Sequence, residues 1–497
     1  MSTPTVSNTL SNTLPTNPLT ILHTSDWHLG RRLYGRMRYE EFEAFLNWLY
    51  DTICIQQVDV LIVAGDIFDT MTPSNRAQAL YYEFLGRVSR SCCEHIVIVA
   101  GNHDSPTFLD APSNVLKFLN VHVIGTACDD LNDEVLVLND TSGAPHCIIA
   151  AVPYLRDRDV RSSSAGESAD SKDANVIKGI RAHYDNVANI AKAKQTAFVK
   201  SHQRHVPIIA TGHLFAAGGK TTEDDGVRDL YVGSLGQVSA EMFDESFDYV
   251  ALGHLHVPQR VGGRERIRYS GSPIAMGFGE ARQQKQVLII KFGEALDAND
   301  VTTPRLPTQT TVKSIKKSAK KLSHQADDLI DDLFGFVEVE NMNERGDLKD
   351  LDTSIPHVND AKTMQISSLA IPCFQKLAQI TGDLTTIAEA IKSLGSTEPV
   401  WLEVIYDGDE IIHELREEIH AMIEGLPCEV LKIKNTRTYN KVLNQEQTSE
   451  DLQDLNEMEV FDHCLEMNGI ATIQKASLRN AYQQILHDIY HDDSQAE

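Results

Sequence analysis

From residue 19 to about residue 292 the chain repeats one pattern: a short apolar, β-branched run, then turn-forming residues, then a polar or helical stretch. The apolar runs cover residues 19–25, 58–64, 95–100, 147–152, 207–212, 248–253 and 286–292. Continuous apolar runs of this length are typical of strands buried on both faces of a sheet. Helices are predicted between them, over 40–55 and 175–202. The pattern therefore predicts an α/β domain over residues 19–295.

The pattern changes after this domain. Residues 296–398 are largely polar or Thr/Lys-rich, and we expect a linker or insertion there together with part of a second domain. The pattern over residues 399–440 predicts a strand, an amphipathic helix and a second strand. Together these elements make a compact βαβ-like unit. Two further helical stretches are predicted within 450–492. Residues 1–18 are rich in Ser, Thr, Asn and Pro, and we expect a disordered tail.

Length and hydropathy narrow the class of protein. The 497 residues exceed the roughly 250–300 at which one core stops growing, so we expect two or three domains. No apolar run approaches the roughly 18 residues of a membrane span. The first residues lack the basic and apolar regions of a secretory signal. We therefore expect a cytoplasmic protein without membrane association.

The net charge of −26 is spread unevenly. Residues 401–497 carry 21 acidic and 7 basic residues, so more than half of the excess lies in the last fifth of the chain. A polyanionic ligand is repelled mainly by that segment. The first 300 residues can still bind phosphate through local basic side chains or metal ions.

Polar side chains capable of binding a metal follow five of the predicted strands. They are Asp26 and His28, Asp66 and Asp69, Asn102 and His103, His213, and the pair His254 and His256. The ends of strands in a largely parallel sheet lie on one rim, which is the usual place for a site in α/β proteins. We therefore expect these groups to converge.

The ligand types indicate the kind of metal. Carboxylate and amide oxygens from Asp26, Asp66 and Asn102, together with four imidazoles and no thiolate, suit Mn²⁺, Fe²⁺ or Zn²⁺ better than Ca²⁺. Seven ligands are too many for one ion. Two ions roughly 3.5–4 Å apart would use all of them, with Asp66 as the natural bridge.

Each motif taken alone has a structural alternative. Asp-x-His after a strand also occurs as a hydrogen-bonded turn, and Gly-Asp-x-x-Asp also occurs at a helix start. The specific signal is the ordered occurrence of all of them directly after apolar runs. The arginines of residues 30–38 are either phosphate ligands or part of an ordinary exposed loop.

The order D-x-H, G-D-x-x-D, G-N-H-D, G-H and G-H-x-H resembles the calcineurin-like metallophosphoesterase superfamily. Within it, TSDWHLG, VAGDIFDT, AGNHDS, ATGHLF, ALGHLH and YSGSP resemble the SbcD nuclease subunit family. The resemblance implies a β-sandwich flanked by helices for the nuclease domain at 19–295. It also implies a small α+β capping domain around 399–440, and a helical, partner-binding C-terminus over 450–492.

The resemblance also implies the roles of the residues. Asp26, His28, Asp66 and His256 would bind one Mn²⁺, and Asp66, Asn102, His213 and His254 the other. His103 would be the catalytic residue that assists the leaving oxygen. Asp69 would orient His103.

The resemblance further implies a partner and a substrate. The partner is the coiled-coil ATPase SbcC, with two copies of each subunit, and the substrate is DNA. We expect a Mn²⁺-dependent 3′-to-5′ double-strand exonuclease with single-strand endonuclease activity. An apolar stripe within 476–490 is consistent with docking on another protein, or with packing on its own domain.

Two alternatives remain open from the sequence. The first is a phosphomonoesterase such as a protein phosphatase, although those enzymes usually read D-R-G and G-N-H-E where this chain has Asp69-Thr70-Met71 and Asn102-His103-Asp104. The second is a scaffold whose metal site only stabilises the fold.

Overall fold

The computed structural model describes residues 18–160, 169–202, 206–216, 239–293, 364–394, 398–408 and 414–436, with a few single positions beside them. These residues divide into two compact units. Unit 1 runs to residue 374 apart from residues 33–36, and unit 2 comprises residues 33–36 and 375–497. Within the part of the chain described, no helix is both long enough and apolar enough to cross a bilayer.

The first sheet of unit 1 has six strands in the order β14-β13-β1-β4-β5-β6. Their bounds are Met364–Ala370, Gln286–Phe292, Leu19–Thr24, Val60–Ala64, His95–Val99 and Val121–Ile124. β1, β4, β5 and β6 run parallel, whereas β13 pairs antiparallel with both β1 and β14. The carboxyl ends of β1, β4 and β5 therefore meet at one edge.

The second sheet has the order β11-β12-β10-β9-β8-β7. Its strands are Gln259–Val261, Arg264–Tyr269, Tyr249–Gly253, Ile208–His213, Pro145–Ala150 and Val135–Asn139. β8, β9, β10 and β12 are parallel, and the outer strands β7 and β11 pair antiparallel with their neighbours. This arrangement brings the carboxyl ends of β9 and β10 together.

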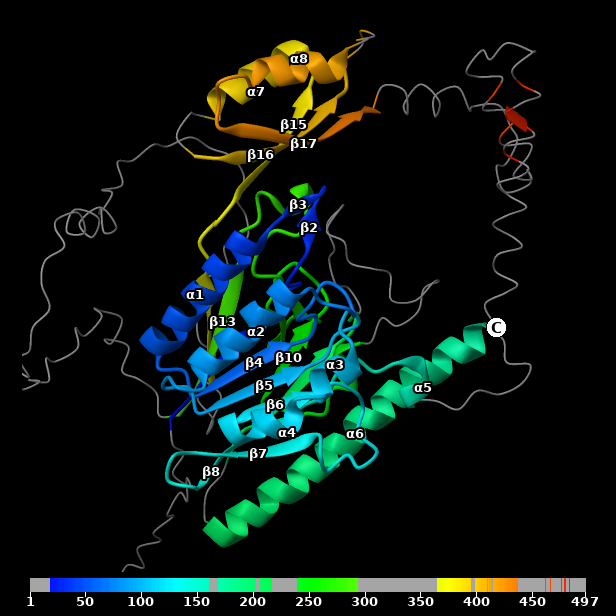
Figure 1. The fold of residues 1–497 in the computed structure, drawn as a ribbon. Helices are drawn as coiled ribbons and strands as arrows, with labels where there is room; N and C mark the ends of the chain where they lie inside the picture. Colours follow the sequence, from blue (N-terminus) through cyan, green and yellow to red (C-terminus); the bar gives the residue numbers. More distant parts are fainter. Residues whose placement is uncertain are drawn as a thin grey trace, which may run out of the picture. The chain divides into compact units, whose positions relative to one another are not determined.

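Apolar side chains pack the two sheets face to face. One buried cluster joins Ile21 and Ile62 of the first sheet to Ile149 and Ile209 of the second. On its other face the first sheet packs against α1 (Tyr39–Gln56) and α2 (Asn75–Val88). The second sheet packs against α6 (Ala169–His202), the long helix in Figure 1. The predicted β-sandwich flanked by helices is thus present in unit 1.

Shorter elements lie between these strands and helices along the chain. They are β2 (Arg32–Leu33), β3 (Arg36–Met37), α3 (Pro106–Asp110), α4 (Ser113–Leu116), η1 (Lys117–Leu119), α5 (Asp157–Val160), η2 (Ala240–Met242) and η3 (Phe278–Glu280).

All seven predicted strands and both predicted helices of this region are present, with ends shifted by a few residues. The expectation of a single rim of one largely parallel sheet was wrong. The strand ends that carry the polar residues belong to two mixed sheets, because β9 and β10 pair with each other and not with β1 or β4. Local patterns of hydrophobicity do not encode which strands pair.

Unit 2 contains a three-stranded parallel sheet in the order β15-β16-β17, with bounds Lys376–Gly382, Val400–Tyr406 and Cys428–Asn435. Residues of α7 (Leu384–Ser393) and α8 (Leu415–Met422) share its core with Val400, Leu402 and Val404. The predicted strand, helix and strand are present. β14, β15 and α7 arise from the segment expected to contain the linker.

Several expectations concern residues outside those described. They are the disordered tail over 1–17, most of the linker over 296–363, and nearly all of the helical segment over 450–492. These expectations stay predictions.

Candidate metal centre

Five strand ends from the two sheets converge at one place in unit 1. Asp26 and His28 follow β1, Asp66 follows β4, and Asn102 and His103 follow β5. The second sheet contributes His213 at the end of β9, and His254 and His256 just after β10. Side chains more than 200 residues apart in the chain are therefore neighbours in space.

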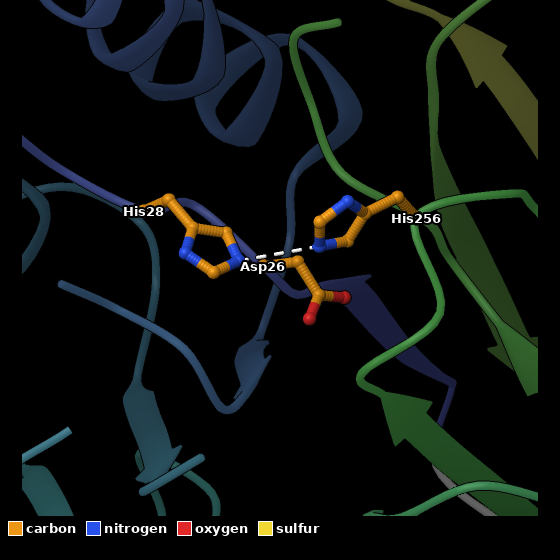
Figure 2. A group of neighbouring side chains, drawn as sticks. All are labelled: Asp26, His28 and His256. Atoms are coloured by element: carbon orange, nitrogen blue, oxygen red, sulfur yellow. Dashed lines mark hydrogen bonds between the residues drawn. The ribbon is translucent and has the colours of Figure 1, made fainter. Parts of the chain in front are cut away.

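One group of possible metal ligands consists of Asp26, His28 and His256, all of them buried. The Nε2 atoms of His28 and His256 lie 3.2 Å apart. Figure 2 shows the two imidazole rings turned toward each other beside the Asp26 carboxylate. Asp26 also accepts a hydrogen bond from the main-chain N–H of His254 at 2.9 Å, which ties this group to the second sheet.

The second group consists of Asp66, His213 and His254, which are also buried. Nε2 of His213 lies 3.3 Å from Oδ2 of Asp66 and 3.0 Å from Oδ1 of Asn102. Nδ1 of His254 lies 3.2 Å from the same Asn102 oxygen. The four side chains thus surround one point with nitrogen and oxygen atoms.

Asp66 lies between the two groups. Its Oδ2 is 3.3 Å from His213 of the second group and 3.6 Å from Nε2 of His28 of the first. One carboxylate oxygen thus approaches a histidine of each group, as a bridging ligand requires.

His103 lies beside the first group. Its ring centroid is 4.8 Å from that of His28. Its Nδ1 lies 2.8 Å from the main-chain carbonyl oxygen of Asp69. The Asp69 carboxylate lies nearest to His28 and Arg31, with Oδ1 at 3.4 Å from Nδ1 of His28 and 3.3 Å from Arg31, and His28, Asp69 and His103 make a third group of possible ligand atoms within 4.8 Å of one another. Asp69 therefore contacts His103 through its main chain and His28 through its side chain.

The backbone at the site is strained. Asp26, His28, Asp66 and His254 all have positive φ, at 53°, 48°, 51° and 102°. Such conformations cost about 1–3 kcal/mol each for residues other than glycine, and they persist where the surrounding structure imposes them. The fold thus holds four of the seven candidate ligands in conformations that turn their side chains inward.

Glycines precede several of these residues because the chains pass close to one another. A Cβ at Gly253 would lie 1.8 Å from the carbonyl oxygen of Ala64, and a Cβ at Gly101 would lie 2.2 Å from Oδ1 of Asp66. The glycine of G-H at Gly253 therefore reflects close approach of the two sheets, and the glycine of G-N-H at Gly101 reflects close approach of the chain after β4 to the chain after β5. A larger side chain at either position would push these segments apart.

Electrostatics keeps part of the site ready to accept a cation. Burial lowers the pKa of His28, and burial together with His213 lowers the pKa of His254 well below its usual range. These rings stay neutral and keep a lone pair. Burial opposes charge on His213 as well, but Asp66 raises its pKa to about 9. Burial would raise the pKa of Asp66, yet His213 and His28 hold it well below its usual range.

The atoms present suit a divalent cation. His213 Nδ1 lies 3.0 Å from the carbonyl oxygen of Ala64, which can only accept, so Nδ1 carries the proton. With its pKa raised to about 9, the ring is charged near neutral pH and its Nε2–H faces oxygens of Asp66 and Asn102, and a bound cation would displace that proton. His254 Nε2 is buried and has no hydrogen-bond partner among the described residues, and Nε2 of His28 faces Nε2 of His256. Once His213 has lost that proton, the imidazole nitrogens and carboxylate oxygens facing one another at these distances form a donor set for Mn²⁺, Fe²⁺ or Zn²⁺.

Sequence reasoning missed three buried residues that support the site. Asp104 accepts main-chain hydrogen bonds from Ile67, Phe68 and Gly101 at 2.8–3.1 Å. Burial and the neighbouring Asp66 raise its pKa to about 7. Glu280 and Lys285 lie behind His256. The quoted G-N-H-D motif already contained Asp104, whereas no periodicity or spacing marks Glu280.

The arginine loop is not a uniform phosphate-binding surface. The Arg38 side chain is fully buried, with Nε and Nη2 donating to Glu41 at 2.7 and 2.8 Å and Nη1 donating to the Ala275 carbonyl at 2.7 Å. Arg31 is largely buried against Asp69. Arg38 therefore has a structural role, and Arg31 is the arginine of this loop that touches the site.

Comparisons with known proteins agree with the motifs. A family model described as calcineurin-like phosphoesterase matches residues 19–258, and one described as type 5 capsule protein repressor C-terminal domain matches residues 373–468. The SbcD subunit of the nuclease SbcCD from Escherichia coli strain K12 is 31% identical over 473 residues, which cover 94% of this chain and 98% of that protein.

Two further SbcD subunits are similar over a shorter range. The Rhodobacter capsulatus protein is 36% identical over 305 residues, covering 59% of this chain and 72% of its own. The Bacillus subtilis protein is 35% identical over 274 residues, covering 54% of this chain and 65% of its own.

Proposed function

Since the chain belongs to the SbcD nuclease family of calcineurin-like phosphoesterases, we propose that it is a Mn²⁺-dependent DNA phosphodiesterase. It acts as a 3′-to-5′ double-strand exonuclease and as a single-strand endonuclease that opens hairpins. It works in the cytoplasm, in DNA repair, recombination and replication. The ATPase SbcC controls it within one complex.

One observation carries this proposal: Asp26, His28 and His256 form one buried group of possible ligands, Asp66, His213 and His254 form another with Asn102 beside it, and Asp66 lies between the two. Asp26, His28 and His256 with Asp66 would hold one Mn²⁺. Asn102, His213 and His254 with Asp66 would hold the second. When bound, the two cations would lower the pKa of a water and offset the negative charge of the phosphoryl oxygens.

His103 supplies the proton chemistry in this proposal. A carbonyl oxygen only accepts hydrogen bonds, so Nδ1 of His103 carries a proton and donates a hydrogen bond to the main-chain carbonyl oxygen of Asp69. The ring would act as the acid when Nε2 is protonated as well: Nε2 would give its proton to the departing oxygen, and the ring would return to the neutral form with its proton on Nδ1. Asp69 orients the ring through its main-chain carbonyl, and its carboxylate orients His28.

We also propose that the chain forms a homodimer within a heterotetramer with SbcC. The similar Escherichia coli protein is named as one subunit of the nuclease SbcCD, which supports the partner. An exposed apolar patch on α4 and η1 supports self-association, because Val115 is 68% and Phe118 90% exposed and Leu119 lies beside them. Apolar side chains that are exposed side by side as a patch, and not singly, are typical of an interaction surface.

A comparison of substrates tests the activity. Purified protein with Mn²⁺ is assayed on linear duplex DNA, on hairpin DNA and on p-nitrophenyl phosphate. We expect DNA cleavage that stops when the metal is chelated and returns with Mn²⁺. Monoester turnover without DNA cleavage would contradict the proposal and favour a phosphomonoesterase built on the same centre.

A further inference from the structure

The imidazole of His256 is contacted at both of its nitrogens. Nε2 faces His28 at 3.2 Å, on the side of the candidate metal ligands. Nδ1 faces Oε1 of Glu280 at 3.5 Å, on the opposite side. A neutral imidazole carries one proton, and a carboxylate at Nδ1 favours the proton on that nitrogen. Nε2 is then left with its lone pair directed into the site.

Glu280 is itself fixed in place. It is fully buried, and its Oε2 accepts hydrogen bonds from Lys285 Nζ at 2.5 Å and from the main-chain N–H of Met276 at 2.9 Å. Its Oε1 is buried and makes no hydrogen bond to the other described residues, although it faces His256. The carboxylate thus has one oxygen held by neighbours and the other directed at the imidazole.

Lys285 neutralises this carboxylate and connects it to the same segment of chain. Its Nζ also donates to the main-chain carbonyl of His256 at 3.3 Å and to Oγ of Ser272 at 3.0 Å. One ammonium group therefore contacts both the backbone of His256 and the carboxylate behind its ring. Burying an ion pair costs desolvation free energy, which is offset only when both charged groups keep well-placed partners. The Glu280–Lys285 pair is therefore fixed in position, and it restricts how the His256 ring can rotate.

The two groups of ligands differ in what lies behind them. In the first group, carboxylates lie behind two histidines: Asp69 at Nδ1 of His28 and Glu280 at Nδ1 of His256. In the second group, the neutral carbonyl of Ala64 lies behind Nδ1 of His213. A carboxylate behind a ligating histidine raises its basicity and orients its ring, and losing it typically costs 10- to 100-fold in metal affinity.

We propose that Glu280, held by Lys285, is a positioning residue that orients His256 toward the ion bound by Asp26, His28 and His256. Loss of Glu280 lowers the affinity for that ion and leaves the affinity for the ion at Asp66, His213 and His254 nearly unchanged. The inference rests on the proposed two-metal centre. A purely structural pair would instead only secure residues 272–285, and its loss would reduce stability without selecting one ion.

The test measures Mn²⁺ binding by the full-length protein. Isothermal titration calorimetry gives the affinity and the number of ions bound, and the electron paramagnetic resonance spectrum shows whether two bound ions are coupled. Glu280→Gln keeps the shape of the side chain and removes its charge. We expect one of the two ions to bind 10- to 100-fold more weakly and the coupled two-ion spectrum to disappear at limiting Mn²⁺. Glu134→Gln is the matched control. Glu134 is also fully buried, its Oε2 lies 2.7 Å from Nε2 of His183, and it contacts none of the candidate ligands.

A second variant covers the case in which Glu280→Gln folds poorly. The double variant Glu280→Gln/Lys285→Met removes both charges, so that no buried charge is left without a partner. Wild-type affinity for both ions in either folded variant would overturn the inference. An equal loss of affinity for both ions, together with a lower melting temperature, would also overturn it. If the wild-type protein bound fewer than two Mn²⁺, the proposed two-metal centre itself would fail.

Discussion

The main-chain N–H of His103 donates a hydrogen bond to Oδ1 of Asp66, and the two atoms lie 2.8 Å apart. The other oxygen of this carboxylate lies between His28 and His213. Asp66 therefore links the loop that carries the proposed proton donor to both groups of metal ligands. Variants at these two positions separate metal binding from chemistry.

Replacing Asp66 should remove both ions. Asp66→Ala deletes the one carboxylate that approaches a histidine of each group, so we expect metal content to fall from two ions per chain to nearly none. Inductively coupled plasma mass spectrometry after gel filtration measures this. Asp59→Asn is a control. Asp59 directly precedes β4, at the end of the strand opposite to Asp66, and its carboxylate accepts a hydrogen bond from the main-chain N–H of Thr20. Two retained ions in Asp66→Ala would rule out the bridging role.

Replacing His103 should abolish cleavage without removing the metal. We expect His103→Ala to lower the DNA cleavage rate at least about 100-fold, since a positioned proton donor contributes 10²–10⁴-fold. Metal content and melting temperature should stay close to wild type, because the ring is not part of either ligand set. If His103→Ala instead loses the metal or unfolds, a scaffold role for the centre is favoured.

A methyl group at Gly253 should destabilise unit 1. Its Cβ would meet the Ala64 carbonyl oxygen at 1.8 Å, so the two sheets must separate. We expect Gly253→Ala to lower the free energy of unfolding by about 1–3 kcal/mol or more. Gly86→Ala is the opposite control, since the nearest atom to a Cβ there is 3.9 Å away within α2, and the change should stabilise the helix by about 0.5–1 kcal/mol. Thermal unfolding distinguishes the two.

Acid should destabilise the metal-free protein partly through His122. Burial, with smaller contributions from His95 and Lys117, lowers the pKa of His122 from 6.5 to about 4. Between these two pH values the unfolded chain binds a proton that the folded protein does not. The contribution to stability is therefore present above pH 6.5 and lost as the pH falls toward 4, at a slope of at most about 1.4 kcal/mol per pH unit.

Urea unfolding of wild-type protein and His122→Gln at several pH values between 7 and 4.5 checks this. We expect the variant to lose less stability on acidification. His420→Gln, on the exposed face of α8, should show the wild-type dependence. Identical slopes for wild type and His122→Gln would exclude His122 as a source of acid sensitivity.

The apolar patch on α4 and η1 should control self-association. Phe118→Glu places a charge where we propose that two copies meet, so we expect the mass in solution to fall from twice the 55.3 kDa of one chain to a single chain. Light scattering during gel filtration measures this. Ile55→Glu is a control at another exposed apolar residue, 73% exposed on α1. If the Phe118→Glu variant still forms a dimer, this patch is not part of the interface.

Hydrophobic patterning along the chain predicted seven strands and two helices of unit 1, but not β6, β7, β12 or α2. Apolar runs such as 58–64 and 95–100 must be buried, and the polar residues that follow them must lie at strand ends, because period and turn residues act within a few positions. The seven candidate ligands were all identified in this way. Their partition between two groups rested on the family resemblance.

How these elements meet follows only from the folded chain. Pairing places β9 and β10 in a second sheet, and packing of the two sheets brings His256 against His28 and Glu280 behind His256. The fold also directs the Asp69 carboxylate to His28 and its carbonyl to His103. Such contacts depend on strand pairing and on side-chain direction across distant segments, and neither quantity is expressed in the hydrophobic pattern of any one segment.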